Sequence, residues 1–218
     1  MRTASKKTSR EWIDGFLFVG NHPALDFLNT RPVLAEGPAE LLPDVGALVR
    51  WLVASGLLTS QKGKALAKEW RDTPQSTVFL RELLKFRERF RAVVLRQEAG
   101  MPVSNAFISE VNSLLLEHPS IVALQRNKKK LDLEAAFQPE KPGDVWAPIA
   151  IAVSELLSDA PPARLRKCEA CIVHFLDTSK KGSRRWCSMN ICGNKIKVAA
   201  YQQRKRVGRN NALKSDAS

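Results

Sequence analysis

The sequence predicts an α+β fold, with a mostly helical N-terminal domain that includes a small β-hairpin and a small cysteine-containing module at the C-terminus. Three observations lead to this prediction. Apolar residues recur at helical spacing through much of the first 158 residues, all four cysteines lie between positions 168 and 192, and basic residues are concentrated around them. A chain of 218 residues can hold one domain of ordinary size and one small domain.

The composition is that of a globular protein, with 44% hydrophobic and 26% charged residues. No apolar run approaches the ~18 residues of a membrane-spanning helix, so we expect no membrane segment. The formal net charge of +13 is unevenly distributed. Residues 161–218 carry fourteen basic and three acidic side chains, which gives +11 and leaves +2 for residues 1–160. Such asymmetry indicates a polyanionic partner for the C-terminal module, although a solvated basic tail is the simpler alternative.

The cysteines form two close pairs, Cys168-x-x-Cys171 and Cys187-x-x-x-x-Cys192, with fifteen residues between them. This spacing is typical of four thiolates that converge on one zinc ion. Two disulfides are the alternative, but they would require an oxidising compartment, and no secretory signal is visible. We therefore predict one structural zinc ion and a cytoplasmic protein. Because a site with four thiolate ligands leaves no open position for water, we do not expect metal catalysis. No nucleophile–base or paired-carboxylate arrangement stands out in the sequence, so we do not expect an enzyme.

The residues between and after the cysteines predict the order of a treble-clef finger. The elements expected are a zinc knuckle at 168–171, a strand at 172–176, a hairpin tip at 177–183 containing Gly182, a returning strand at 184–187, and a helix from 189 to 206 that Ser188 caps and that carries Cys192. His174 is interpreted as a residue of this hairpin and not as a catalytic base, because His22 and His118 are distant in sequence.

The predicted C-terminal helix is amphipathic in an unusual sense. Cys192, Ile196 and Ala199 share the face toward the metal, and cations with one aromatic residue occupy the opposite face. Duplex DNA is the favoured partner, with RNA or an acidic protein surface as alternatives, and the cations could also serve to balance the thiolates and solubilise the module. The candidate nucleic-acid contacts are Arg184, Arg185, Lys195, Lys197, Tyr201, Arg204, Lys205 and Arg206.

Two segments carry a family resemblance. Cys192-Gly193-Asn194-Lys195 and the preceding FLDTSKKGSRRWCSM resemble the CGNR-type zinc finger, with Lys195 in place of the family's arginine. Lysine keeps the charge but lacks the planar fork of arginine. The segment FVGNHPALDFLNT (Phe18 to Thr30) resembles the opening of the ABATE domain, which usually precedes this finger in bacterial proteins. The resemblance implies a DNA-binding regulator from a family regarded as stress-induced transcription regulators.

The remaining sequence predicts the organisation of the N-terminal domain. We expect helices at 24–31, 44–54, 60–70, 76–99, 104–117 and 145–157, a hairpin with a basic tip between 120 and 137, a strand or helix start at 12–19, and a Pro-rich loop through Pro43. The predicted boundaries are a disordered start at 1–10, an ABATE-like domain at 11–158, a Pro-containing linker at 159–163, the finger at 164–209 and a disordered tail at 210–218.

A compact polar group in the first predicted helix is a candidate ligand pocket or interface. It consists of Asp26, Asn29, Thr30 and Arg31. The alternative is turn and capping chemistry with one buried ion pair. The N-terminal domain is expected to receive a signal or to form a homodimer.

Overall fold

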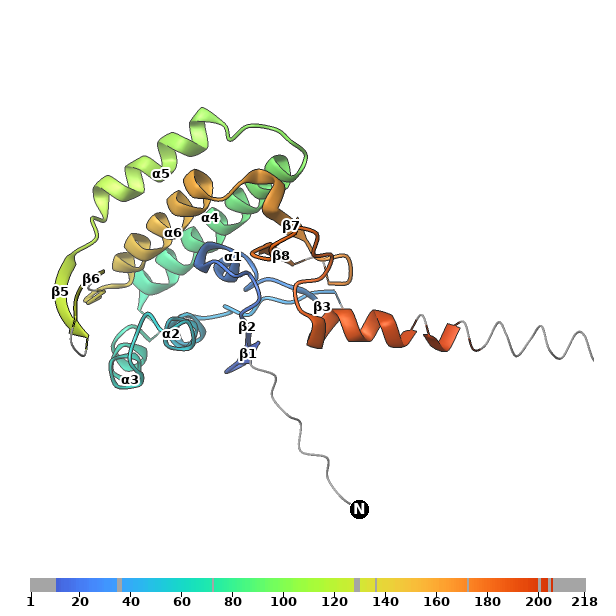
Figure 1. The fold of residues 1–218 in the computed structure, drawn as a ribbon. Helices are drawn as coiled ribbons and strands as arrows, with labels where there is room; N and C mark the ends of the chain where they lie inside the picture. The colour runs from blue at the N-terminus through green and yellow to red at the C-terminus, as the bar shows by residue number, and fades with distance from the viewer. Residues whose placement is uncertain are drawn as a thin grey trace, which may run out of the picture.

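The computed structural model describes residues 11–34, 37–71, 73–127, 130–135, 137–171, 173–199, 201–203 and 205. The predicted disordered segments, 1–10 and 210–218, lie outside the described residues. The predicted fold class is confirmed, because helices with small β-hairpins form the N-terminal region and the four cysteines cluster in the C-terminal module (Figure 1).

Most helices begin where a capping side chain predicts a start. The side chains of Asp44, Thr59, Thr73 and Ser104 each accept a hydrogen bond from the backbone N–H three residues later, which satisfies a donor that the helix itself cannot pair. The helices of the N-terminal region are α1 (Pro23–Leu28), α2 (Val45–Ala54), α3 (Ser60–Glu69), α4 (Pro74–Glu98), α5 (Asn105–Glu117) and α6 (Trp146–Asp159).

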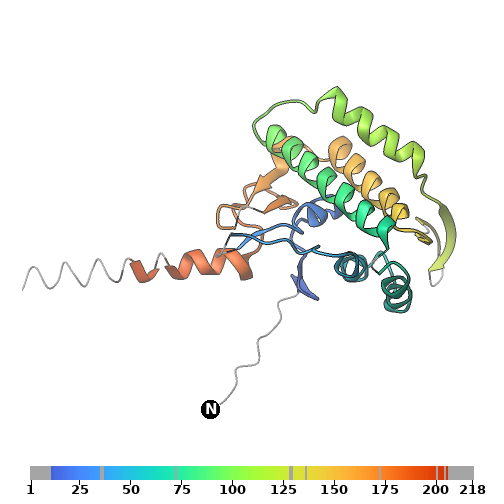
Figure 2. The same ribbon diagram turned by 180° about the vertical axis from the view of Figure 1, so that it is seen from behind.

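The core is organised around α4, the longest of these helices, which lies beside α6 in both ribbon views (Figures 1 and 2). The ring of Phe86 meets Trp146 edge-on at 5.3 Å and stacks on Phe107 at 5.7 Å, so that one residue of α4 contacts both α6 and α5. Burial of each such side chain contributes about 1.5–3 kcal/mol. The buried stripe along α4 is the one that the sequence predicts and includes Phe79, Leu83, Phe86, Phe90 and Val94.

Four antiparallel hairpins complete the described fold. The strands are β1 (Trp12–Ile13) with β2 (Phe16–Leu17), β3 (Val33–Leu34) with β4 (Gly37–Pro38), β5 (Val122–Asn127) with β6 (Lys130–Ala135), and β7 (Leu165–Lys167) with β8 (His174–Leu176). The β5–β6 pair confirms the hairpin predicted between 120 and 137. The β3–β4 pair lies in the segment predicted as a Pro-rich loop, because two-residue strands leave no periodicity in a sequence.

One strand pairing in the C-terminal module was predicted wrongly. Strand β8 pairs with β7, and residues 184–187, predicted as the returning strand, form no strand. The physical reason is that the carboxylate of Asp177 closes the following loop, accepting from the backbone N–H groups of Ser179 at 2.9 Å and Arg184 at 2.8 Å. The knuckle cysteines therefore lie in the turn between β7 and β8.

Candidate metal centre and basic surface

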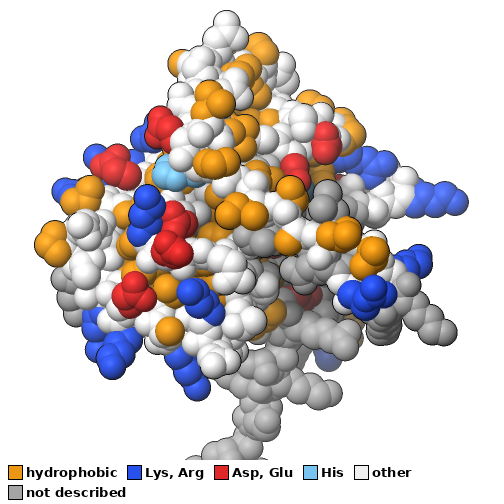
Figure 3. Space-filling view, turned by 90° about the vertical axis from the view of Figure 1, so that its left-hand side faces the viewer, with side chains coloured by type: hydrophobic (Ala, Val, Ile, Leu, Met, Phe, Trp, Pro, Cys, Tyr) orange, Lys and Arg blue, Asp and Glu red, His pale blue; other side chains and the backbone are white. Residues whose placement is uncertain are grey.

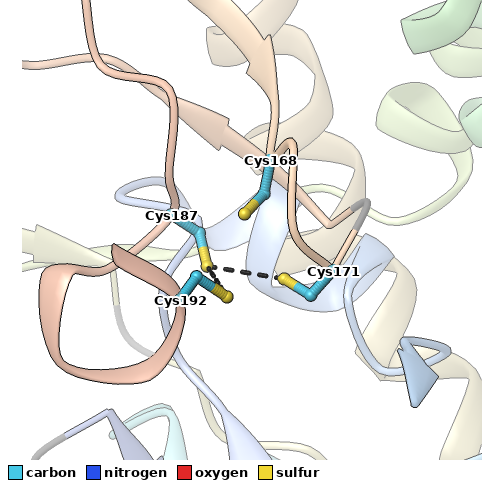
Figure 4. A group of neighbouring side chains, drawn as sticks. All are labelled: Cys168, Cys171, Cys187 and Cys192. Carbon is cyan, nitrogen blue, oxygen red and sulfur yellow. Dashed lines mark hydrogen bonds between the residues drawn. The ribbon is translucent and has the colours of Figure 1, made fainter. Parts of the chain in front are cut away.

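The four cysteine sulfurs point toward one another from two sides of the C-terminal module (Figure 4). All four sulfurs lie within 4.8 Å of one another, and the Sγ atom of Cys187 lies 3.6 Å from that of Cys171 and 3.7 Å from that of Cys192. A tetrahedral zinc ion with Zn–S distances of about 2.3 Å requires sulfur separations of about 3.8 Å. A disulfide would need about 2.05 Å. The donor set therefore fits one zinc ion, and the prediction of a zinc site is confirmed.

The fourth ligand is positioned by a wide helical turn, Met189–Gly193. The N–H groups of Cys192 and Gly193 both donate to the carbonyl of Ser188, at 3.1 and 3.0 Å, and the second of these bonds spans five residues, as in a π-helix. As the sequence predicts, Ser188 also caps this turn, because its Oγ accepts from the N–H groups of Asn190 and Ile191. The turn places the Cys192 thiol beside that of Cys187.

The electrostatics of the cluster favour a cation. Hydrogen bonds from the thiols of Cys171 and Cys187 lower the pKa of Cys168, so that one thiolate forms readily. Burial, together with the nearby Cys171, raises the pKa of Cys192 to about 12. Four adjacent thiolates repel one another unless a divalent cation is present, so metal binding drives the remaining deprotonations.

The module does not form its small core alone. The buried cluster around Cys168, Cys187 and Cys192 also contains Leu17 and Val19 from the N-terminal end of the chain. The carboxylate of Glu11 accepts a hydrogen bond from the hydroxyl of Ser188, the residue that caps the Cys192 turn. The β1–β2 hairpin is therefore part of the metal centre's support, which the sequence did not indicate.

The segment Phe18 to Thr30 forms hydrogen bonds with the edge of β8 that does not pair with β7. Asn29 is 1% exposed, and its side-chain amide donates to the carbonyl of His174 at 2.8 Å and accepts from the N–H of His174 at 3.1 Å. The carbonyl of Gly20 accepts from the N–H of Leu176 at 2.8 Å, and the amide of Asn21 donates to the Leu176 carbonyl at 2.9 Å. These bonds replace a third strand, so β8 is hydrogen-bonded along both edges.

The other members of the predicted polar group stabilise this segment. Asp26 accepts from the N–H of Gly20 at 2.8 Å. Burial raises the pKa of Asp26 to about 6, although hydrogen bonds from the backbone of Gly20 and Val19 oppose the shift. Thr30 accepts from the guanidinium of Arg87 at 2.8 Å, and Arg31 lies 3.4 Å from Glu88.

His174 lies in β8 and is 2% exposed, with its Nε2 atom 3.6 Å from a carboxylate oxygen of Glu98 in α4. Burial lowers the pKa of His174 despite the attraction of Glu98. The buried His174 ring therefore packs between the C-terminal module and α4.

Residues 21–160 match the ABATE family, described as "putative stress-induced transcription regulator". The chain belongs to the ABATE family. Residues 164–205 match the CGNR zinc finger, which agrees with the cysteine geometry. Neither family is a family of enzymes. Comparison with curated proteins gave no match.

The ABATE chain contains no helix that is long and apolar enough to cross a membrane among the residues the structure describes.

The two arginines of the CGNR finger that were predicted as nucleic-acid contacts have partners within the chain. The Arg184 guanidinium donates to the Cys187 carbonyl at 2.5 Å and stacks 4.9 Å from the centre of the Phe175 ring. The Arg185 guanidinium forms an exposed ion pair with Glu169 at 2.5 Å and lies 5.5 Å from the Trp186 ring centre. Arg184 thus helps to hold Cys187 in place.

The other predicted contacts lie on the C-terminal helix of the CGNR finger, whose helical residues are 194–199, 201–203 and 205. This helix projects away from the ABATE domain in both ribbon views (Figures 1 and 2). Lys195, Lys197 and Lys205 are exposed. Val198 and Tyr201 are also exposed, at 54% and 61%. Arg204 and Arg206 lie outside the described residues.

Proposed function

We propose that the protein is a bacterial, cytoplasmic, zinc-dependent transcription regulator whose CGNR finger binds duplex DNA. One observation carries the proposal, namely that a helix attached directly to the metal centre carries cations and leaves even its valine and tyrosine exposed. Helices in proteins owe most of their stability to packing of one face. A projecting helix of about 10–12 Å diameter matches the width of the DNA major groove, which would supply that packing.

In this proposal zinc has a structural role only. It holds the Cys192 turn against the knuckle of Cys168 and Cys171, and thereby fixes the direction in which the C-terminal helix leaves the body. We assign the finger to the treble-clef class, because a knuckle precedes a helix that carries the last ligand.

The basic side chains divide between two roles. Lys195, Lys197 and Lys205 are the proposed phosphate contacts, and Tyr201 lies on the same exposed helix. Arg185 is a further candidate contact, because its ion pair with Glu169 is exposed and a phosphate could replace the carboxylate. Arg184 is assigned to the support of the metal centre because of its bond to the Cys187 carbonyl.

The ABATE domain is proposed to supply regulation, as a sensor or as an oligomerisation module, with the linker at 159–163 between it and the finger. The hydrogen bonds between β8 and the residues Gly20, Asn21 and Asn29 support a regulatory role for the ABATE domain. They connect the finger to the segment that contains α1, so a rearrangement of the ABATE helices would change the orientation of the finger.

The test is a fluorescence-anisotropy titration of the zinc-loaded protein with duplex DNA from its own upstream region. A scrambled duplex and a structured RNA serve as competitors at two salt concentrations. The proposal expects the native duplex to bind at least about tenfold more tightly, a difference of about 1.4 kcal/mol that persists at the higher salt. Tighter binding of the RNA would indicate an RNA-associated protein, and no binding at low salt would indicate an adaptor for an acidic protein.

A triple variant tests the assignment of the lysines. Replacing Lys195, Lys197 and Lys205 by Ala should reduce the slope of log affinity against log salt by about 2.7, because each lost phosphate contact contributes about 0.9. The control replaces three exposed lysines of the ABATE domain, Lys64, Lys68 and Lys141. An equal loss of slope in the control would show that only the total charge matters.

A further inference from the structure

The β5–β6 hairpin turns an apolar face toward solvent. Val122 and Leu124 alternate along β5, and the strand register puts Leu131 of β6 on the same face, diagonal to Leu124. These three residues are 59%, 66% and 55% exposed. The apolar face of an antiparallel pair normally packs on a core, and an isolated two-stranded hairpin is only marginally stable in water. Among the residues that the structure describes, this apolar face therefore has no partner that covers it.

The apolar surface continues from the hairpin onto α5. Leu116 near the end of α5 is 82% exposed, Ile121 just before β5 is 67% exposed, and Ile108 lies two helical turns before Leu116 with 44% exposed. Figure 3 views the molecule from this side and shows hydrophobic side chains gathered over its upper part. We call the six residues Ile108, Leu116, Ile121, Val122, Leu124 and Leu131 the outer apolar face.

The size of the outer apolar face matches the requirement of a dimer. The exposed fractions of its six residues add up to about 3.7 whole residues. With about 100 Å² of apolar surface for each aliphatic side chain, two copies would bury about 740 Å² of apolar area. Since about 65% of a homodimer interface is apolar, the whole interface would be about 1,100 Å², which is above the lower limit of about 1,000 Å² for a specific contact.

The charges at the two ends of the face favour a second copy of this chain over another partner. Arg126, which pairs with Leu131 beside the hairpin tip, is exposed and basic, and Glu117, at the root of the hairpin, is exposed and acidic. In the described part of the chain neither of the two takes part in an ion pair. In an antiparallel two-fold arrangement the basic tip of each hairpin reaches the acidic root of the other, so the surface is complementary to itself.

We propose that the protein forms a two-fold symmetric homodimer through the outer apolar face, with the β5–β6 hairpins packed antiparallel. The inference gives the oligomerisation role of the proposed function a specific surface. It rests on the proposed function only where it concerns DNA, because the dimer would present two fingers to the duplex. Dimerisation itself can be measured without nucleic acid.

The first experiment is sedimentation equilibrium of the zinc-loaded full chain from about 1 to about 100 µM, a range in which mass action shifts a micromolar dimer. We expect a dimer, and we expect Leu124→Glu to raise its dissociation constant by at least about 100-fold, since the dimer would bury an unpaired charge. The matched control is Leu95→Glu, the same change at a leucine of α4 that is 42% exposed, which should leave the dimer intact. A chain that is monomeric throughout, or a dimer that Leu124→Glu and Leu95→Glu weaken equally, would overturn the proposal.

A charge exchange provides a second test that does not depend on the apolar residues. Arg126→Glu and Glu117→Arg should each weaken the dimer about tenfold or more, and the double variant should recover most of the affinity, because the two positions meet across the two-fold axis. A double variant as weak as the sum of the single changes would contradict the antiparallel arrangement.

DNA titrations separate this inference from the proposed function. If Leu124→Glu is monomeric and the wild-type dimer does not bind DNA, the interface stands and the regulator proposal fails. If the wild-type chain binds its duplex but is monomeric at every concentration, the regulator proposal stands and the interface fails.

Discussion

Removing the Asn29 side chain should uncouple the CGNR finger from the ABATE domain. Asn29→Ala deletes a donor and an acceptor that are fully buried, and it leaves both the N–H and the carbonyl of His174 without those partners. A buried polar group left unpaired costs about 1–3 kcal/mol, so two such groups should lower the free energy of unfolding by about 2–6 kcal/mol. For a chain of this length that corresponds to a fall of about 5–15 °C in the melting temperature.

Asn21, which lies in the same segment and bonds to Leu176, provides the matched control. Its amide also bonds to the β8 backbone, but the bond is exposed, so water can replace it. Asn21 has a φ of +55°, and glycine accepts this conformation without strain, so Asn21→Gly removes only the side chain. The expected loss is about 0.5–1.5 kcal/mol. Chemical unfolding of the zinc-loaded proteins measures both variants, and an Asn29→Ala variant no less stable than Asn21→Gly would refute the reasoning.

Three further outcomes are expected. Asp26→Asn should stabilise the protein at pH 7.5 by about 1–3 kcal/mol. Burial raises the pKa of the wild-type carboxyl from 3.8 to about 6, so the wild-type protein loses stability as the pH rises through that interval. An amide stays uncharged and can still accept the hydrogen bond from the N–H of Gly20. If chemical denaturation at pH 7.5 shows no gain in stability, the carboxylate is not buried in the folded protein. Gly20→Ala should cost about 2 kcal/mol or more, because a Cβ would lie 2.7 Å from the Cβ of Leu25 and 2.9 Å from the backbone N of Asp26, whereas Gly143→Ala, with its nearest atom 3.9 Å away, should be neutral in the same assay. Removal of zinc by a chelator should increase amide hydrogen exchange in residues 11–20 as well as in 165–193, since both segments form the core around the cysteines; protection of residues 11–20 that does not change would contradict a shared core.

The sequence predicted those parts of the fold whose cause is local. Capping side chains such as Asp44 and Ser104 bond to N–H groups three residues away, so the helix starts are visible in short stretches. The cysteine spacing was sufficient for the metal centre, because each pair lies in one tight local structure.

Contacts between distant parts of the chain could not be predicted in the same way. The partner of Asn29 is a backbone group 145 residues away, and no pattern in either segment identifies it. The pairing of β7 with β8 involves three residues on each strand, too few for an alternating pattern. The sequence alone suggests that Arg184 is available to bind a partner. In the structure its guanidinium donates to the Cys187 carbonyl, because the loop before Cys187 brings the two groups together.

The contact between Glu11 and Ser188 has a consequence for biosynthesis. The two residues are 177 positions apart, so the cap of the Cys192 turn is completed by one of the first described residues of the chain. During translation the ABATE helices can assemble while the finger is still being made, but Leu17 and Val19 must wait for the last cysteines to leave the ribosome. A nascent chain truncated before Cys187 would expose these two residues and could not bind metal with four ligands. Zinc loading therefore follows the synthesis of Cys192, and only chains that extend through Cys192 acquire a protected N-terminal hairpin.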